Sequence, residues 1–243
     1  MAARVIRLGS APSTNDLGKE LLRAGEPHGT VIIAARQTRG RGQRGRRWAS
    51  PPGGLWASLL VRPKLEVTQA GLLNIASVVA AGEAGAAVSG VSIRIKWPND
   101  LLVQGRKVGG VLVETSAARG VIAWATIGVG VNANVSCASL PAGLRASAAS
   151  LAEEAGRVIS LDALLGELCD RTQRGLDLIE SGAVDEILAA WRALDATPGR
   201  EVRSSRGERI GIAQGIDSLG RLVVTVARGE SLPFPTTRGI IIA

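Results

Sequence analysis

The sequence predicts an α+β protein with a larger N-terminal part and a small all-β unit at its C-terminus. Short apolar runs typical of strands alternate with long segments whose apolar residues recur at helical spacing. Near Thr197 the pattern changes to short segments of alternating polarity. A chain of 243 residues that is 46% hydrophobic has globular composition and can bury a sizeable core. We therefore expect two domains, residues 1–195 and residues 196–243.

The N-terminal part begins with an apolar segment at residues 5–8, which predicts a strand. Ser13 and Thr14 follow, and hydroxyl side chains of this kind cap the start of helices. Residues 16–24 have the apolar spacing of an amphipathic helix. We therefore expect a strand followed by a helix with a hydroxyl residue at its start.

Two strands are then expected at residues 30–35 and 55–62, with a long loop between them. The loop, residues 37–54, is basic and rich in glycine and has no periodicity. Loops of this length in a compact domain usually carry function or are disordered. A helix is expected after the second strand, at residues 67–88, although several glycines weaken it.

The rest of the N-terminal part predicts more strands and two long helices. The strands are expected at residues 93–97, 101–103, 108–114 and 121–131. Turn residues at 98–100 end the first of these, and residues 104–107 join the next two into a hairpin. Residues 137–147 have the composition of a loop. The helices are expected at residues 161–181 and 184–194.

The C-terminal unit contains only strand patterns. They are expected at residues 201–203, 209–216, 221–226 and 239–242. The turn signal at residues 217–220, Asp-Ser-Leu-Gly, joins the second and third of these as a hairpin. We therefore expect a small β-domain from about residue 196 onwards.

Compartment signals favour a cytoplasmic protein. The most apolar stretch, residues 72–91, contains Asn74 and Glu83, which predicts a buried helix rather than a membrane span. The N-terminus lacks the apolar core of a secretory signal. Cys137 and Cys169 are the only cysteines, so a disulfide framework is excluded and a reducing setting is expected.

The net charge of +8 is concentrated in one segment. Residues 27–65 contain no Asp or Glu. Their eight cations equal the whole excess of Lys and Arg (29) over Asp and Glu (21), and they are Arg36, Arg39, Arg41, Arg44, Arg46, Arg47, Arg62 and Lys64. Proteins that bind polyanions usually spread their charge over a face. One basic segment on a neutral body instead indicates a local anion site.

The core of that segment, residues 36–48, combines arginines with glycines. Glycine lets the backbone N–H groups approach an anion, and arginine offers forked donors to phosphate. The segment is no Walker loop, because no Gly-Lys-Ser/Thr follows. Its Gly-x-Gly-x-x-Gly string is followed by Trp48 and two prolines rather than by a helix pattern, so it is no dinucleotide fingerprint. The plain alternative is a solvated charged loop.

A second group of residues lies near the predicted hairpin. The segment 96–100, Lys-Trp-Pro-Asn-Asp, places polar side chains at a strand end, where the plain alternative is a turn. Lys107 precedes Gly109 and Gly110, and the segment 128–132, Gly-Val-Gly-Val-Asn, repeats the combination of glycines and a polar end. Glycines inside strands often mark the close approach of a ligand, although a β-bulge also explains them. A ligand that lies across a sheet is the functional interpretation.

Taken together, these motifs resemble the biotin protein ligase family. The matching segments, in the order of the family, are Ser13-Thr-Asn15, Gln37-Thr-Arg-Gly-Arg-Gly42 with Arg46-Arg-Trp48, Lys96-Trp-Pro-Asn-Asp100, Arg106-Lys-Val-Gly-Gly-Val111 and Gly128-Val-Gly-Val-Asn132. The segment 211–217, Gly-Ile-Ala-Gln-Gly-Ile-Asp, is similar to the C-terminal β-barrel of the family. Each motif is weak alone, whereas the ordered set is specific.

The resemblance implies a mixed sheet flanked by helices, as in class II synthetases, and a small SH3-like β-barrel. It also implies a ligase that uses ATP and Mg²⁺ to convert biotin into biotinyl-5′-AMP and pyrophosphate. The biotinyl group then passes to a specific lysine of a biotin carboxyl carrier protein. The resemblance allows a homodimer and implies no membrane partner.

The resemblance also assigns the site residues. Lys107 and Arg41 are implied to be catalytic, because joining a carboxylate to a phosphate brings like charges together and needs fixed cations. The residues implied to bind biotin are Ser13, Thr14, Asn15, Gln37, Arg41, Gly42, Gln43, Lys107, Gly109 and Gly110. Those implied to bind the nucleotide are Gly40, Arg41, Trp48, Asn99, Asp100, Lys107 and Asn132. No metal set of the chain itself is implied, since Mg²⁺ arrives with ATP.

The sequence departs from the family at several places. Gln43 stands where the family has the second arginine of its loop, a position linked to retention of the adenylate. Arg39 stands where a small residue is usual, and residues 230–242 match the family poorly. The Ser-Thr-Asn motif begins at residue 13, so we expect the short form of the family, without an N-terminal DNA-binding domain and without binding to operator DNA.

Two other functions remain open from the residues. A lipoyl or octanoyl transferase has a related fold, but such enzymes tend to lack the Gly-Arg-Gly loop. A protein that binds RNA through the Arg-Gly segment would stack bases on exposed aromatic side chains. This chain has no Tyr, and its one Phe, Phe234, is far from the loop in sequence.

Overall fold

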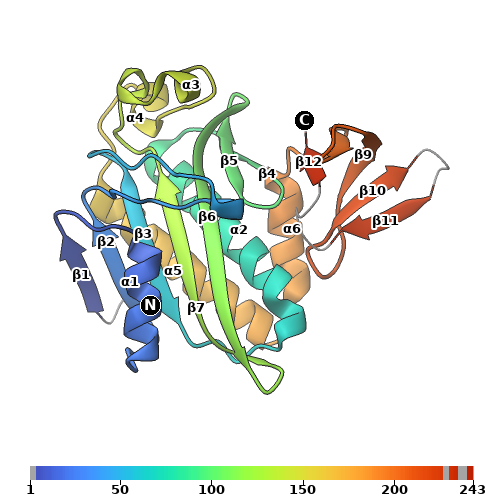
Figure 1. Ribbon diagram of the computed structural model, residues 1–243, viewed down its shortest axis with the longest axis horizontal. Helices are drawn as coiled ribbons and strands as arrows, with labels where there is room; N and C mark the ends of the chain where they lie inside the picture. The colour runs from blue at the N-terminus through green and yellow to red at the C-terminus, as the bar shows by residue number, and fades with distance from the viewer. Residues whose placement is uncertain (1–3, 227–229, 235–239, 243) are drawn as a thin grey trace.

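The computed structural model describes residues 4–226, 230–234 and 240–242, and within these ranges it contains two β-sheets (Figure 1). The larger sheet has seven strands in the order β1-β2-β3-β7-β6-β5-β4. Their bounds are Arg4–Leu8 (β1), Thr30–Ala34 (β2), Leu55–Val61 (β3), Arg94–Lys96 (β4), Asp100–Val103 (β5), Arg106–Ala118 (β6) and Val121–Val131 (β7). β1 pairs with β2 in parallel, and the other neighbours pair antiparallel, so the predicted mixed sheet is confirmed.

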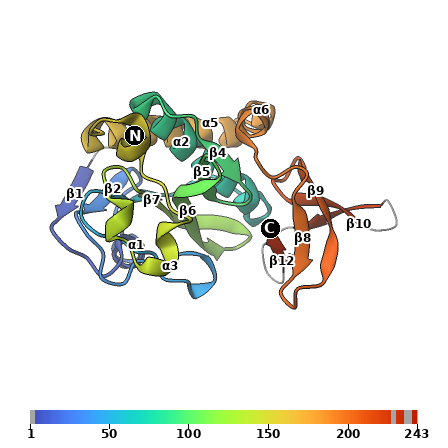
Figure 2. The same ribbon diagram turned by 90° about the horizontal axis from the view of Figure 1, so that it is seen from above.

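Helices cover both faces of this sheet. Figure 2 shows α2 (Ala70–Ser89), α5 (Leu161–Glu180) and α6 (Val184–Leu194) on one face and α1 (Thr14–Arg23) on the other. The alternation of side chains along a strand explains the two faces. The odd-numbered residues of β3 and those of β7 from 125 to 131 join the main hydrophobic core, as Leu55, Ala57, Leu59, Val61, Ala125, Ile127, Val129 and Val131. Even-numbered residues such as Ser58, Gly128 and Gly130 face the side of α1.

The predicted buried helix is confirmed in α2, which packs between the sheet and α5. A short 3₁₀ turn at Val67–Gln69 precedes it, and the helix ends at Gly90 in the left-handed conformation that glycine favours (φ 76°). The helical segment Val67–Ser89 is long and apolar enough to cross a membrane, judged by length and composition only. However, 67% of its apolar window is buried inside the protein, so it serves as a core helix.

The smaller sheet is antiparallel and has the order β11-β10-β9-β8-β12. Its strands are Glu201–Ser204 (β8), Arg209–Ile216 (β9), Leu222–Val226 (β10), Ser231–Phe234 (β11) and Ile240–Ile242 (β12). The predicted turn at 217–220 joins β9 and β10, and the sheet is consistent with an SH3-like unit. Buried residues of this sheet, such as Val202 and Ala213, belong to the main core cluster. We keep residues 1–195 and 196–243 as proposed domain bounds, which divide the chain between α6 and β8.

Some elements differ from the sequence prediction. β6 begins at Arg106, so Lys107 lies in a strand instead of the predicted turn. The predicted loop at 137–147 contains a 3₁₀ turn at Cys137–Ser139 and the helix α3 (Ala142–Arg145), and α4 (Leu151–Ala155) follows it. These helices are too short to show a periodic pattern. β11 was not predicted, since it contains a proline. Gly239, the first residue of the strand expected at 239–242, and residues 1–3 of the N-terminus lie outside the described residues.

Candidate functional site

A cavity of about 400 Å³ lies on the face of the large sheet that carries α1, and its volume is typical of small-molecule sites. Segments far apart in the sequence line it: the start of α1, the basic loop, the ends of β4 to β7, the residues around α3 and the last strand, β12. Six cations line it: Arg41, Arg44, Arg46, Arg47, Lys96 and Lys107. Asp100 is the one carboxylate among the described lining residues. The cavity therefore favours an anionic ligand.

One end of the cavity is a buried polar cluster at the start of α1. Ser13 is the N-cap of α1 and accepts a hydrogen bond from the backbone N–H of Asp16. The backbone N–H of Thr14 donates to Gln37 Oε1 (2.8 Å), and Gln37 Nε2 donates to Ser50 Oγ (2.9 Å). The predicted residues Ser13, Thr14 and Gln37 thus lie together and present amide and hydroxyl groups.

Asn15 is held from three directions. Ser58 Oγ donates to Asn15 Oδ1 (2.6 Å), while Asn15 Nδ2 donates to the carbonyl of Leu112 (3.1 Å) and to Glu114 Oε2 (3.0 Å). A Cβ atom on Gly128 would lie 2.3 Å from Asn15 Oδ1. Gly128 in β7 therefore makes room for the Asn15 amide, and both residues line the cavity.

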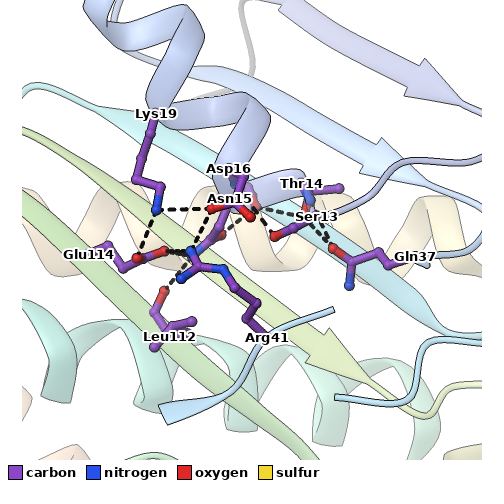
Figure 3. A network of polar contacts seen from close by, with 10 residues as sticks. Ser13, Thr14, Asn15, Asp16, Lys19, Gln37, Arg41, Leu112 and Glu114 are labelled. Atoms are coloured by element: carbon purple, nitrogen blue, oxygen red, sulfur yellow. Dashed lines mark hydrogen bonds and ion pairs between the residues drawn. The ribbon is translucent and has the colours of Figure 1, made fainter. Parts of the chain in front are cut away.

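Glu114 connects Asn15 with an ionic network (Figure 3). Its carboxylate accepts from Asn15, from Lys19 Nζ (3.0 Å) and from Arg41, and Arg41 also pairs with Asp16 Oδ1 (2.9 Å). Burial alone would raise the pKa of Glu114, but the hydrogen bonds from Arg41, Asn15 and Lys19 outweigh burial and lower it. The hydrogen bond to Glu114 raises the pKa of Arg41. Both groups are therefore held in their charged forms.

The opposite end of the cavity carries Lys107 and Lys96. Lys107 Nζ pairs with the Asp100 carboxylate and lies 5.1 Å from the centre of the Trp48 ring, within cation–π range. Burial lowers the pKa of the half-buried Lys96, and the negative charge of Asp100 opposes this effect. Two lysines thus face one carboxylate, which leaves positive charge for an anion.

Trp48 belongs to the apolar wall between the two ends. Its ring packs edge-on against Trp56, with 6.4 Å between ring centroids. A Cβ atom on Gly130 would lie 2.8 Å from Trp48 Nε1, so this glycine allows the indole to lie on β7. Trp48 Nε1 and Arg41 Nε are buried donors without an acceptor among the described residues. Both residues line the cavity.

The basic loop folds as a narrow ladder. Gln37 pairs with Ser50 and Arg41 with Arg47 in antiparallel bridges. The Trp48 N–H donates to the Gly40 carbonyl (2.9 Å), and the Gly42 N–H donates to the Arg46 carbonyl (2.8 Å). The loop is therefore more ordered than its missing periodicity predicted.

Most of the predicted site residues line the cavity. They are Ser13, Thr14, Asn15, Gln37, Arg41, Gly42, Gln43, Trp48, Asn99, Asp100, Lys107, Gly110 and Asn132. Gly40 and Gly109 do not line it. A Cβ atom on Gly40 would lie 2.6 Å from the Trp48 carbonyl, and one on Gly109 would lie 2.8 Å from the Gly130 carbonyl. Both glycines thus permit close packing of backbone.

Several lining or supporting residues were missing from the predicted site. Lys96 stands in a motif that the sequence analysis quoted, so its charge could have been included. Glu114 lies among the apolar residues of β6, and that interruption was its only signal. The residues Ile240–Ile242 carry no chemical pattern, and only the tertiary structure brings β12 to the cavity.

Comparison with known proteins connects this geometry with a family. The model of the biotin/lipoate A/B protein ligase family matches residues 8–132. The bifunctional ligase/repressor BirA of Bacillus spizizenii is 32% identical over 89% of this chain and 68% of its own length. The biotin–[acetyl-CoA-carboxylase] ligase of Paracoccus denitrificans is 30% identical over 83% of this chain and 86% of its own. A solved biotin protein ligase from Aquifex aeolicus in complex with biotin and ATP is 26% identical, has a TM-score of 0.84 and covers 99% of this chain and 100% of its own.

Proposed function

The chain belongs to the biotin/lipoate A/B protein ligase family, and we propose that it is the ATP-dependent ligase that attaches biotin to a biotin carboxyl carrier protein. The three relatives described above are ligases, and two of them are named for biotin. The fold over nearly the whole chain is that of a biotin protein ligase.

The distribution of chemistry along the cavity is the observation that carries this proposal. The cluster around Thr14 and Gln37 offers donors and acceptors to a ureido head. The aromatic and aliphatic wall around Trp48 suits an apolar tail. The cations at the end around Lys107 suit a carboxylate and a phosphate. This order of groups matches biotin, which carries the same three features in the same order.

The proposed reaction has two steps. An oxygen of the biotin carboxylate attacks the α-phosphorus of ATP, the α–β phosphoanhydride bond breaks, and pyrophosphate leaves with both electrons of that bond. The neutral amine of a carrier lysine then attacks the acyl carbon, loses a proton and expels AMP. Lys107 is proposed to hold the carboxylate and the α-phosphate oxygens together, since a fixed cation in a partly buried site offsets their repulsion.

Asp100 and Asn132 are proposed to serve the nucleotide. Mg²⁺ prefers oxygen ligands and usually takes few from the protein and several from phosphates. The Asp100 carboxylate fits this preference. Asn132 Nδ2 donates to the Ala149 carbonyl (3.0 Å), which leaves its oxygen as an acceptor. When bound, Mg²⁺ would neutralise charge on the phosphates, and Asp100 would supply one of its ligands.

The partners and the compartment are proposed in the same terms. We expect a biotin carboxyl carrier domain as the acceptor. We expect the cytoplasm as the compartment, because both cysteines are free thiols. We expect no operator DNA as a ligand and leave a homodimer as a proposal.

Mass spectrometry of an acceptor protein tests the function. A biotin carrier domain is incubated with this protein, Mg²⁺, ATP and biotin, and we expect the mass of one biotinyl group on a single lysine. The matched controls omit ATP, or replace biotin by octanoate or lipoate. Transfer of octanoyl or lipoyl groups in place of biotin would favour the related transferases instead.

A further inference from the structure

We propose that Glu114 is a positioning residue for biotin binding, which acts by holding Arg41 and thereby fixes the basic loop beside the polar end of the cavity. The identity of the ligand rests on the proposed function. Glu114 itself does not line the cavity, whereas Arg41 and Asn15, which it contacts, both do. Glu114 would therefore act on the ligand indirectly, chiefly through Arg41.

Glu114 lies in β6, and its carboxylate contacts side chains from two other segments. Its carboxylate receives Asn15 and Lys19 from α1 and Arg41 from the basic loop (Figure 3). The Glu114 side chain is 24% exposed and that of Arg41 is 34% exposed, so water screens this pair only in part. Charge-assisted hydrogen bonds in such a setting are stronger than those between neutral groups.

The charges of the network balance within it. Glu114 and Asp16 supply two negative charges, and Arg41 and Lys19 supply two positive charges. Arg41 is thus engaged with carboxylates on α1 and β6. The geometry assigns Arg41 to anchoring the loop.

Arg41 is well placed to transmit this anchoring to the loop backbone. It sits in the antiparallel bridge with Arg47, between the hydrogen bonds made by Gly42 and by Trp48. Releasing its side chain would therefore loosen the ladder on which the Trp48 wall depends. On the other side, Glu114 and Ser58 together fix the orientation of the Asn15 amide.

Two measurements on three variants test the inference. Glu114→Gln, Arg41→Gln and the double variant are compared by calorimetric titration with biotin in the absence of ATP. Each single change is expected to weaken biotin binding about tenfold, because the Glu114–Arg41 pair is lost in both. If Glu114 acts through Arg41, the double variant is no weaker than the weaker single variant. In Glu114→Gln the kcat for adenylation at saturating biotin is expected to stay within about twofold, since Lys107 and Arg41 are both untouched.

Hydrogen exchange of the loop gives a readout that needs no biotin. The Gly42 and Trp48 amides are expected to exchange faster in Glu114→Gln than in the wild type, while Glu114→Asp, which keeps the charge, stays closer to the wild type. The matched control is Glu83→Gln, because Glu83 pairs with Arg171 between α2 and α5, away from the cavity.

Each outcome bears on the proposal separately from the proposed function. Unchanged biotin affinity and loop exchange in Glu114→Gln, or multiplicative losses in the double variant, would overturn the role of Glu114. A wild-type protein that binds no biotin would overturn the proposed function, and the exchange rates would still report whether Glu114 anchors the loop. If circular dichroism shows that Glu114→Gln does not fold, Glu114→Asp and Arg41→Gln test the proposal by the same two measurements, biotin affinity and hydrogen exchange of the loop.

Discussion

At the residue scale, Lys107 has the central role in the proposed reaction. It pairs with Asp100 and lies over Trp48, next to the Gly110 backbone. We predict that Lys107→Gln keeps the fold and slows adenylation, because about 2–4 kcal/mol of transition-state stabilisation is lost. Release of pyrophosphate at saturating biotin and ATP measures this loss. The control is Lys64→Gln, because the exposed Lys64 does not line the cavity; a near-wild-type rate for Lys107→Gln would remove Lys107 from the catalytic role.

Gly128 offers a second prediction at this scale. Its missing side chain makes room for the Asn15 amide, which hydrogen bonds to Ser58 and Glu114 hold in place. Gly128→Ala must displace that amide, so we expect biotin binding to weaken by about tenfold or more and stability to fall by about 1–3 kcal/mol. Calorimetric titration and urea unfolding measure the two effects.

The matched control for Gly128 is Gly166→Ala. Gly166 is exposed in α5, and a Cβ atom there would meet nothing within 4 Å. Alanine is therefore expected to leave biotin binding unchanged and to add about 0.5–1 kcal/mol of helix stability. Equal losses in both glycine variants would mean that Asn15 is not the affected group.

At the element scale, the loop of residues 37–48 combines a backbone ladder with five arginines, Arg39, Arg41, Arg44, Arg46 and Arg47. Mutual repulsion of these charges opposes closure of the loop, and an anionic ligand would supply counter-charge. We predict that biotin together with ATP slows hydrogen exchange and proteolysis of this loop. Equal protection with and without the ligands would contradict the prediction. Residues 161–180 of α5 serve as an internal reference, since they lie on the opposite face of the sheet.

The short elements around α3 extend this picture. Leu140, Leu144 and Ser147 line the cavity from a segment that the sequence predicted as loop. The Lys107 backbone contacts this segment directly, because its N–H donates to the Ser147 carbonyl (2.7 Å) and its carbonyl accepts from the Ala149 N–H (2.8 Å). The backbone of Lys107 is therefore hydrogen-bonded to the segment that forms this part of the cavity wall.

At the scale of the whole molecule, the two sheets meet at Trp97. Its backbone N–H donates to Thr197 Oγ1 (2.9 Å), and its indole Nε1 donates to the Gly220 carbonyl (3.0 Å). Arg44 of the basic loop donates to the Ile240 carbonyl (2.6 Å) in β12. These contacts fix the C-terminal unit against the N-terminal part and explain how β12 reaches the cavity.

The distribution of charge over the molecule gives a further prediction. The excess positive charge lies in one segment, and four of its eight cations line the cavity together with Lys96 and Lys107. Binding in a DNA groove needs several phosphate contacts on one face and depends steeply on salt. We predict only weak, non-specific DNA binding at physiological salt, which falls further when biotinyl-adenylate occupies the cavity. Sequence-dependent binding tighter than about 1 μM that survives the adenylate would contradict this prediction.

The sequence alone determined most of the elements, and its resemblance to a family named most of the residues that line the cavity. The N-cap at Ser13, the strand β7 and the helix α6 follow from local signals: capping chemistry, apolar runs and periodicity. The family resemblance named Thr14, Gln37 and Lys107, which all line the cavity, and their roles stay predictions. The predictions of the elements succeeded because each depends on neighbouring residues along the chain.

The tertiary structure alone decided which of these residues touch. Arg41 and Glu114 are separated by 73 positions, and Arg44 and Ile240 by 196. Periodicity and turn chemistry act over a few residues and carry no information about pairing at such separations. The same limit explains why the sequence did not show that Gly128 and Gly130, which line the cavity, also make room for the side chains of Asn15 and Trp48. The sheet order brings these strands and loops together, and only then do their charges and volumes determine one another.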